Sequence, residues 1–316
     1  MKKLFFIPLL ILTNAHADVP DSYKAIFAPL SDSAPNKDNP SSPAKIELGK
    51  KLYFEKKLSI DQDISCNSCH NLETYGVDNE PTSPGHKGQR GDRNSPTVLN
   101  AAFHIAQFWD GRAKDVEEQA IGPILNPVEM AMPAEKEVVQ RLEADPEYVK
   151  LFKAAFPGEA NPLTYINIGN AIGSFERTLI TPSRFDDYLK GDDNAITQAE
   201  KEGLKTFVES GCITCHSGMV VGGMMYQKLG LVKPYPTEDT GRFKHTNNEA
   251  DKYFFKVPSL RNVEKTAPYF HDGSIKTLED AVKTMGEYQL GRNLSDEQVS
   301  SIVTFLKSLT AKEVKY

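Results

Sequence analysis

Two short motifs contain all four cysteines of the chain. Residues 66–70 read Cys-Asn-Ser-Cys-His, and residues 212–216 read Cys-Ile-Thr-Cys-His. In such a motif the two thiols can add to the vinyl groups of a haem, and the histidine can bind its iron. A thioredoxin-like redox pair or half of a zinc site would also use paired cysteines. The histidine after each pair favours haem, so we predict two covalently bound haems c. Their attachment residues are Cys66, Cys69 and His70 in the first motif and Cys212, Cys215 and His216 in the second.

An internal repeat surrounds both motifs. In each half, a helix-like stretch, the cysteine motif, a loop, a Pro-x-x-x-Asn sequence and an Asp-Gly pair follow in the same order. The two motif histidines are 146 positions apart, and the later features are 162 positions apart. These later pairs are Pro96 with Pro258, Asn100 with Asn262, and Asp110-Gly111 with Asp272-Gly273. The repeat indicates a duplicated c-type cytochrome unit whose two copies can be compared for specialisation.

The two copies differ after the Asp-Gly pair. The second half has Met285, whose thioether could bind the second iron opposite His216 and raise its reduction potential. At the same repeat position the first half has Pro123, which cannot be a ligand. We therefore predict one iron with His216 and Met285, and one iron held by His70 without a sulfur ligand. Met285 could also be an ordinary core residue, and there are competing sulfur ligands. They are Met219, Met224 and Met225.

The open side of the first iron has several candidate partners. His86 lies in a Pro-Gly-His-Lys-Gly loop, from which it could bind and leave the iron without unfolding a helix, or could simply be solvated. An iron that reduces peroxide also needs a group that moves a proton between the two oxygens. Glu129 follows the Asp-Gly region in a turn-rich Asn-Pro-Val-Glu-Met segment that could direct its carboxylate to the iron. The other candidates are Glu117, Glu118 and Gln119.

Trp109 is the only tryptophan of the chain and directly precedes the first Asp-Gly pair. Its repeat counterpart is His271. A ring at both places could carry an electron between two haems, or both rings could pack at the interface of the two units.

The elements that position these residues read as helices. Pro43 after Ser42 is typical of a helix start, and Thr197 and Ser295 each begin a capping-box pattern. Further helical stretches are expected at 116–120, at 134–156 and before Thr181-Pro182. Strand-like alternation is not convincing anywhere. The predicted fold is all-α, with two c-type cytochrome-like domains, each around one covalent haem, and long loops.

Composition and the first residues suggest an exported protein. Residues 1–17 combine two lysines, a short apolar run and Ala-His-Ala, which predicts a cleaved signal peptide. The 35 basic and 43 acidic residues that remain give a net charge of −8, which argues against nucleic acid as a partner. We expect an N-terminal domain at 18–185 and a C-terminal domain at 186–316, joined by a linker at 186–194. The C-terminal helix is allowed to pack back on the first domain.

These motifs resemble those of the bacterial dihaem cytochrome c peroxidases over essentially the whole chain after residue 17. The resemblance is carried by both cysteine motifs and by Asn94-Ser-Pro-Thr97, Gln107-Phe-Trp-Asp-Gly-Arg112, Pro127-Val-Glu-Met130, Ala267-Pro-Tyr-Phe-His-Asp-Gly273 and Met285-Gly-x-Tyr-Gln-Leu-Gly291. The resemblance implies a periplasmic homodimer that reduces hydrogen peroxide to water with electrons from a small c-type cytochrome or cupredoxin.

The resemblance also implies residue roles. His70 would hold the peroxidatic haem with His86 as displaceable distal ligand, while the haem of His216 and Met285 would accept electrons. The other implied roles are Glu129 as acid–base residue, Gln119 as second distal-pocket residue, Trp109 between the haems, and one calcium ion on the Asn94 side chain and the carbonyls of Thr266 and Pro268.

Two alternatives stay open. A related branch matures a tryptophan-derived quinone and has tyrosine as the C-terminal distal ligand. Met285 at that position favours the peroxidase, but the nearby Tyr288 keeps the quinone-maturing dihaem oxidase as an alternative. The other alternative is a dihaem electron-transfer cytochrome without catalytic activity.

Overall fold

The structure is a computed structural model that describes residues 19–316, so the predicted signal peptide at 1–17 lies outside the described residues. The helices of the first half are α1 (Asp21–Lys24), α2 (Pro43–Tyr53), α3 (Cys66–Cys69), α4 (Val116–Leu125), α5 (Glu135–Glu143), α6 (Pro146–Ala155) and α7 (Tyr165–Glu176). Those of the second half are α8 (Arg184–Leu189), α9 (Gln198–Ser210), α10 (Phe243–Thr246), α11 (Leu278–Thr284) and α12 (Asp296–Lys307). Within 19–316, every helix falls short of the length and apolar character needed to cross a bilayer.

The helix starts follow from local capping. Ser42 caps α2 with Pro43 as its first residue, and Thr197 and Ser295 form the predicted capping boxes of α9 and α12. The expected single helix at 134–156 is instead two helices. Asp145 accepts a hydrogen bond from the backbone of Glu147 and so begins α6 after α5 has ended.

Two short strands are the main departure from a purely helical chain. Strand β1 (Tyr226–Lys228) pairs antiparallel with β2 (Phe254–Lys256), and Tyr226 lies opposite Lys256. Three residues per strand are too few for an alternating pattern to be visible in the sequence. The fold remains largely helical.

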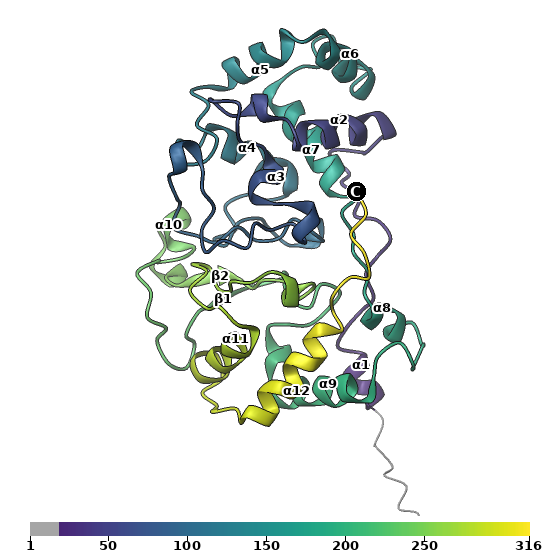
Figure 1. Cartoon of the computed structure of the whole chain (residues 1–316), viewed down its shortest axis with the longest axis vertical. Helices are drawn as coiled ribbons and strands as arrows, with labels where there is room; N and C mark the ends of the chain where they lie inside the picture. The colour runs from purple at the N-terminus through teal and green to yellow at the C-terminus, as the bar shows by residue number, and fades with distance from the viewer. Residues whose placement is uncertain (1–18) are drawn as a thin grey trace, which may run out of the picture.

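Two apolar cores divide the helices into two groups, which Figure 1 shows above and below a middle zone with β1 and β2. Helices α2, α4 and α7 pack around the first core, and α9, α11 and α12 pack around the second. Each end of the chain packs against the core of the other group. Val19 and Phe27 of the N-terminal arm belong to the second core, whereas Val314 near the C-terminus packs against the first. It is this tail, after α12, that reaches the first core.

The segment 186–194, expected as a linker, is only partly one. Its first residues lie in α8, where Phe185 and Tyr188 are buried in the second core. Asp186 is fully buried and accepts two hydrogen bonds from Arg261, at 2.7 and 2.8 Å. Only residues 190–194 form an exposed connection. The charged residues that suggested a linker thus include one that is paired inside the protein.

The sequence repeat is also a structural repeat. Asn100 and Asn262 both have left-handed backbone conformations, with φ of 61° and 62°, and both side chains donate a hydrogen bond to Thr181 Oγ1. The backbone N of Asn100 donates to Leu179 O, and that of Asn262 donates to Leu309 O. The final turns of α7 and α12 therefore occupy equivalent places, 130 positions apart, in the two units.

Candidate functional site: two cysteine motifs

The first cysteine motif forms the short helix α3. Ser65 and Ser68 make a capping box at its start, and the backbone N of His70 donates to Cys66 O at 2.9 Å. Tyr53 from α2 donates its hydroxyl hydrogen to His70 O at 2.5 Å. These contacts present two thiols and an imidazole from one rigid turn that is anchored to the first core.

The second motif follows α9 directly. Gly211 ends α9 with φ of 93°, and Cys212–Thr214 then form the 3-10 turn η5. The backbone N of His216 donates to Cys212 O at 3.0 Å. A Cβ atom at Gly222 would lie 2.2 Å from Pro258 O and 3.2 Å from His216 Nδ1, so only glycine lets this loop pass beside the imidazole.

The chemistry of these residues fits covalent haem. Nδ1 of His70 and of His216 is buried without a hydrogen-bond partner among residues 19–316, and burial lowers both imidazole pKa values, for His216 to about 4. Each ring therefore stays neutral, which is the form that binds a metal. All four cysteines are free thiols. In the described part of the chain no three His, Cys, Asp or Glu side chains gather as a zinc site would require.

His216 and Met285 line one cavity. Met285 follows α11 and begins a π-helical turn, η8 (Met285–Gln289). The cavity wall also includes Cys212, Cys215, Leu278, Leu294, Ile302 and Leu306. The competing sulfur atoms lie elsewhere. Met219 Sδ accepts a hydrogen bond from Ser31 N at 3.3 Å, and Met224 is 55% exposed.

Glu129 lies beside the first motif. Its backbone N donates to Asn126 O at 3.0 Å, which closes the turn after α4. Burial raises the pKa of the Glu129 carboxyl, although Arg112 and a hydrogen bond from the Asn126 side chain oppose this effect. Burial, together with the negative charges of Asp78 and Glu129, raises the pKa of the Cys69 thiol to about 11, so Glu129 acts electrostatically on the first motif. A carboxyl group with a raised pKa can hold and return a proton near neutral pH.

The loop that contains His86 is joined to the Glu129 segment. The backbone N of His86 donates to Glu129 O at 2.8 Å, and a Cβ atom at Gly85 would lie only 2.0 Å from Val128 O. The imidazole Nδ1 of His86 is 3.2 Å from Asp61 Oδ2. The predicted displaceable histidine and the predicted acid–base residue therefore share one structural unit.

Gln119 and Trp109 are positioned by different parts of the fold. Gln119 is half-buried on α4, the helix that leads into that turn. The Trp109 indole donates to Asn94 O at 2.9 Å, and its ring meets His271 edge-on with centroids 6.5 Å apart. Each ring residue also accepts a hydrogen bond from the other unit: Asn94 N donates to His271 O, and Lys256 N donates to Trp109 O. The two rings meet where the units join.

The three predicted calcium ligands line the same cavity wall as Trp109. The Asn94 amide nitrogen donates to Glu80 O at 3.0 Å. The backbone oxygens on both sides of Thr266, of Lys265 and Ala267, accept hydrogen bonds from the side chain of Asn79. Asn94, Thr266 and Pro268 thus line one cavity although they come from distant parts of the chain.

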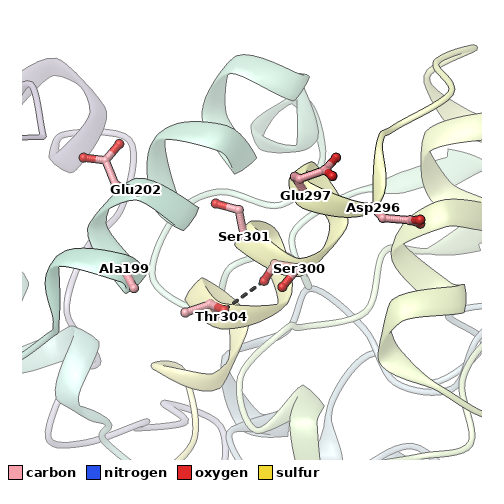
Figure 2. A pocket seen from close by; sticks show the side chains of 7 residues that line it. All are labelled: Ala199, Glu202, Asp296, Glu297, Ser300, Ser301 and Thr304. Atoms are coloured by element: carbon pink, nitrogen blue, oxygen red, sulfur yellow. Dashed lines mark hydrogen bonds between the residues drawn. The ribbon is translucent and has the colours of Figure 1, made fainter.

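A second hollow lies on the outer face of α9 and α12 (Figure 2). Its lining residues are Ala199, Glu202, Asp296, Glu297, Ser300, Ser301 and Thr304. In Figure 2 the Glu202 side chain on α9 points away from Glu297 and Asp296 on α12, and neither cysteine motif contributes to the hollow. This place offers no cofactor chemistry.

Comparison with known proteins agrees with this geometry. The family profile described as di-haem cytochrome c peroxidase matches residues 43–194. The cytochrome c551 peroxidase of Pseudomonas aeruginosa is 49% identical over 300 residues, covering 93% of this chain and 86% of that protein. The chain belongs to the di-haem cytochrome c peroxidase family. The cytochrome c551 peroxidase of Nitrosomonas europaea is 52% identical, with 87% of this chain and 82% of the relative covered.

More distant members of the di-haem peroxidase family are also similar. The methylamine utilization protein MauG of Methylorubrum extorquens is 35% identical, over 89% of this chain and 82% of that protein. A crystal structure of a MauG-like protein associated with microbial copper homeostasis matches with a TM-score of 0.79 and 29% identity, covering 90% of this chain and 94% of that one. Identity to the two peroxidases is higher than to either MauG protein, and the chain is an oxidoreductase of the di-haem peroxidase class.

Two residues of this di-haem peroxidase were missed by sequence reasoning. Arg112 stacks its guanidinium over Phe108 at 3.5 Å and acts on the Glu129 carboxyl. The position of Arg112 directly after the Asp-Gly pair was the feature of the sequence that could have identified it. Lys256 is buried in the wall of the His216 cavity. The repeat pairs Lys256 with Asn94, and this correspondence was the feature of the sequence that could have identified it.

Proposed function

We propose that this protein reduces hydrogen peroxide to water with two electrons from a small c-type cytochrome or cupredoxin. The balanced reaction is H2O2 + 2 H+ + 2 e− → 2 H2O. The observation that carries the proposal is the inequality of the two motifs. His216 shares a cavity with a thioether, Met285, whereas the first motif is acted on by a half-buried carboxyl group, Glu129, whose pKa is raised by desolvation.

When bound, two haems supply iron that exchanges electrons and, at one site, binds peroxide. His216 and Met285 would hold the electron-accepting iron, because a thioether favours the reduced state. We assign His70 to the peroxidatic iron. Trp109, held by Asn94 and Lys256 at the junction of the units, is placed to mediate electron transfer between them.

Glu129 is assigned the proton transfer. Its raised pKa lets it accept the proton of one peroxide oxygen and give it to the other, so that water can leave. Arg112 opposes the rise in the pKa of this carboxyl, and the half-buried Gln119 is assigned as a further contact in the distal pocket. His86 is assigned as the residue that would hold the resting iron of the first haem, and its loop would have to shift to open that site to peroxide.

The remaining assignments concern the whole molecule. We infer two haem domains, 18–185 and 186–316, whose N-terminal arm and C-terminal tail each reach the other core. A calcium ion at Asn94, Thr266 and Pro268 would tie them together through oxygen ligands. The basic, apolar and Ala-His-Ala sequence at 1–17 supports export to the periplasm, and a homodimer is implied by family resemblance.

A quinone-maturing oxidase with a tyrosine ligand is less well supported. The Tyr288 ring packs edge-on against Tyr235 at 5.3 Å, and Lys233 lies over its other side. Met285, three positions earlier, lines the His216 cavity. The available tyrosine is therefore engaged elsewhere, and the thioether is the better ligand.

The proposal is tested by replacing Glu129 with Ala. We expect peroxide-dependent oxidation of a reduced cytochrome c to fall by about 10²-fold or more, since proton transfer in the transition state is lost. Haem content should stay at two per chain. Glu118→Ala is the matched control, because Glu118 is exposed on α4 and accepts only a local hydrogen bond from Lys114 N. Full activity in Glu129→Ala would contradict a role for Glu129 in proton transfer. If the native protein shows no peroxide-dependent oxidation of a reduced cytochrome c, the peroxidase proposal is wrong and the electron-transfer cytochrome is the remaining alternative.

A further inference from the structure

Lys256 is a buried lysine at the junction of the two units. It ends strand β2, and only 6% of its surface is exposed. Its backbone N donates to Trp109 O at 2.8 Å, so the backbone position is held by the other unit. The side chain belongs to the wall of the cavity that also contains Cys212, His216 and Met285.

The Lys256 ammonium lacks a counter-charge within the polypeptide. Among residues 19–316 no hydrogen bond or ion pair reaches its Nζ, and burial, with no compensating carboxylate, lowers its pKa to about 8. The nearby His104 cannot compensate, because it is a buried neutral imidazole whose Nε2 also lacks a partner. A buried cation without an anion costs several kcal/mol, so its partner is expected to come from outside the chain.

A molecule that occupies the cavity can supply that partner, because Lys256 lines the cavity wall. The cavity is otherwise lined by mostly apolar side chains and leads from Lys256 to the second cysteine motif. A haem attached at Cys212 and Cys215 has two acidic groups, its propionates. The repeat adds a second argument: Lys256 takes the place that Asn94 takes in the first unit, so the two units differ in charge at equivalent positions.

We propose that Lys256 is the buried counter-ion of a propionate of the haem held by the second motif. This inference rests on the proposed function only in requiring a haem at Cys212, Cys215 and His216. The ammonium would hold the carboxylate in place beside the Trp109 backbone. Its positive charge would also stabilise the reduced iron, which carries one positive charge less, and would add to the effect of Met285 on the reduction potential.

The test compares Lys256→Met and Lys256→Arg with Lys252→Met in the full, haem-loaded protein. Lys252 is a partly exposed lysine of the same loop that pairs with Glu249 at 2.7 Å, so its loss changes the net charge equally. Two quantities are measured: the midpoint potential of the second haem by spectroelectrochemical titration, and the propionate bending bands in the low-frequency resonance Raman spectrum.

We expect Lys256→Met to lower the midpoint potential and shift the propionate bands. Lys256→Arg should stay near the wild-type values, and Lys252→Met should change neither quantity. Unchanged potential and bands in Lys256→Met, with the second haem attached, would overturn the counter-ion role and leave the peroxidase proposal intact. Native protein without haem at the second motif would instead overturn the proposed function.

Haem attachment itself provides an outcome if Lys256→Met does not mature. Lys256→Gln is then prepared in the same way. Loss of the second haem from both neutral variants, with retention in Lys256→Arg, would support a required positive charge. Loss from Lys256→Arg as well would show that packing, and not charge, is what the site needs, and would overturn the inference.

Discussion

Two carboxyl groups act electrostatically on the cysteines of the first motif, and only one of them was predicted. Besides the half-buried Glu129, there is Glu176 in the last turn of α7, which is 4% exposed. Burial, together with Glu117, raises its pKa to about 8, although Arg177 opposes this. By the structural repeat, Glu176 of α7 corresponds to Leu306 of α12, which lines the cavity of the second motif. The repeat therefore accounts for a Glu176 side chain that faces the first motif.

Glu176 should make the protein less stable as pH rises. Between the unfolded carboxyl pKa, about 4.3, and the folded value of about 8, the folded state binds a proton that the unfolded state does not. The free energy of unfolding therefore falls by up to about 1.4 kcal/mol per pH unit in this window and levels off above it. Glu176→Gln should remove this fall in denaturant unfolding at pH 5 to 8. Equal slopes in both proteins would contradict a raised pKa; Glu143→Gln, on the protein surface, is the control.

Met285 should set the potential of the second haem. Replacing it with His exchanges a thioether for a nitrogen ligand that favours the oxidised iron, so the midpoint potential of that haem should fall strongly. A redox titration followed by optical absorption measures the shift. Met224→His, at an exposed sulfur outside the cavity, should leave the potential unchanged, and an unchanged potential in Met285→His would mean another ligand.

At the scale of elements, the His86 loop and the Glu129 turn act as one piece. Backbone hydrogen bonds from His86 N to Val128 O and Glu129 O hold them together, and Gly85 passes within contact of the turn. The turn after α4 is packed on the first core through Met130. The proposed resting ligand and the proposed acid are therefore connected through the backbone, and any movement of His86 relative to the turn must break these hydrogen bonds.

Gly85→Ala should weaken this association. The added Cβ would meet Val128 O at 2.0 Å, so the loop must shift away from the turn. If His86 is the resting ligand, the oxidised variant should show a larger high-spin fraction at the first haem by electron paramagnetic resonance. It should also react with peroxide with less prior reduction. Gly91→Ala is the control, because a Cβ there meets nothing within 4 Å, and identical spectra for both variants would contradict the assignment.

At the scale of the whole molecule, the junction of the two units is built from equivalent residues of the repeat. Thr181 Oγ1 accepts hydrogen bonds from both Asn100 and Asn262, at 2.8 and 2.9 Å. Nearby, each unit donates one backbone hydrogen bond to the ring residue of the other, Trp109 or His271. These reciprocal contacts bring the ring residues together and fix the distance that an electron must travel between the motifs.

Thr181→Val should loosen this junction. Thr181 is 1% exposed, and the substitution keeps its shape but leaves two buried amide groups without an acceptor. We expect a loss of about 1–3 kcal/mol in the free energy of unfolding, measured by denaturant titration. Thr178→Val, at an exposed site nearby, should cost less than about 0.5 kcal/mol. Equal stability of both variants would show that the shared hydroxyl does not hold the units together.

The sequence alone was sufficient to predict the two cysteine motifs, the helix caps and the register of the repeat. A Cys-x-x-Cys-His turn and a capping box involve residues within five positions, so their geometry follows from spacing alone. The contrast between Met285 and Pro123 also needed only the repeat. The short strands and the packed helix α8 were missed, because three-residue strands have no visible period and the burial of Asp186 depends on Arg261, 75 positions away.

Long-range packing decided what surrounds each motif. The identity of Glu129 as the carboxyl group beside Cys69, rather than Glu117 or Glu118, depends on how the turn after α4 meets α3. Glu117 instead pairs with Arg177, and Glu118 is exposed. Likewise, the sequence alone predicts an exposed side chain for a lysine in a short segment such as Lys256. Lys256 is buried in the cavity of the second motif because β1 pairs with β2 and because its backbone contacts Trp109. Burial and charge pairing are properties of the assembled units, which is why the tertiary structure was needed to place them.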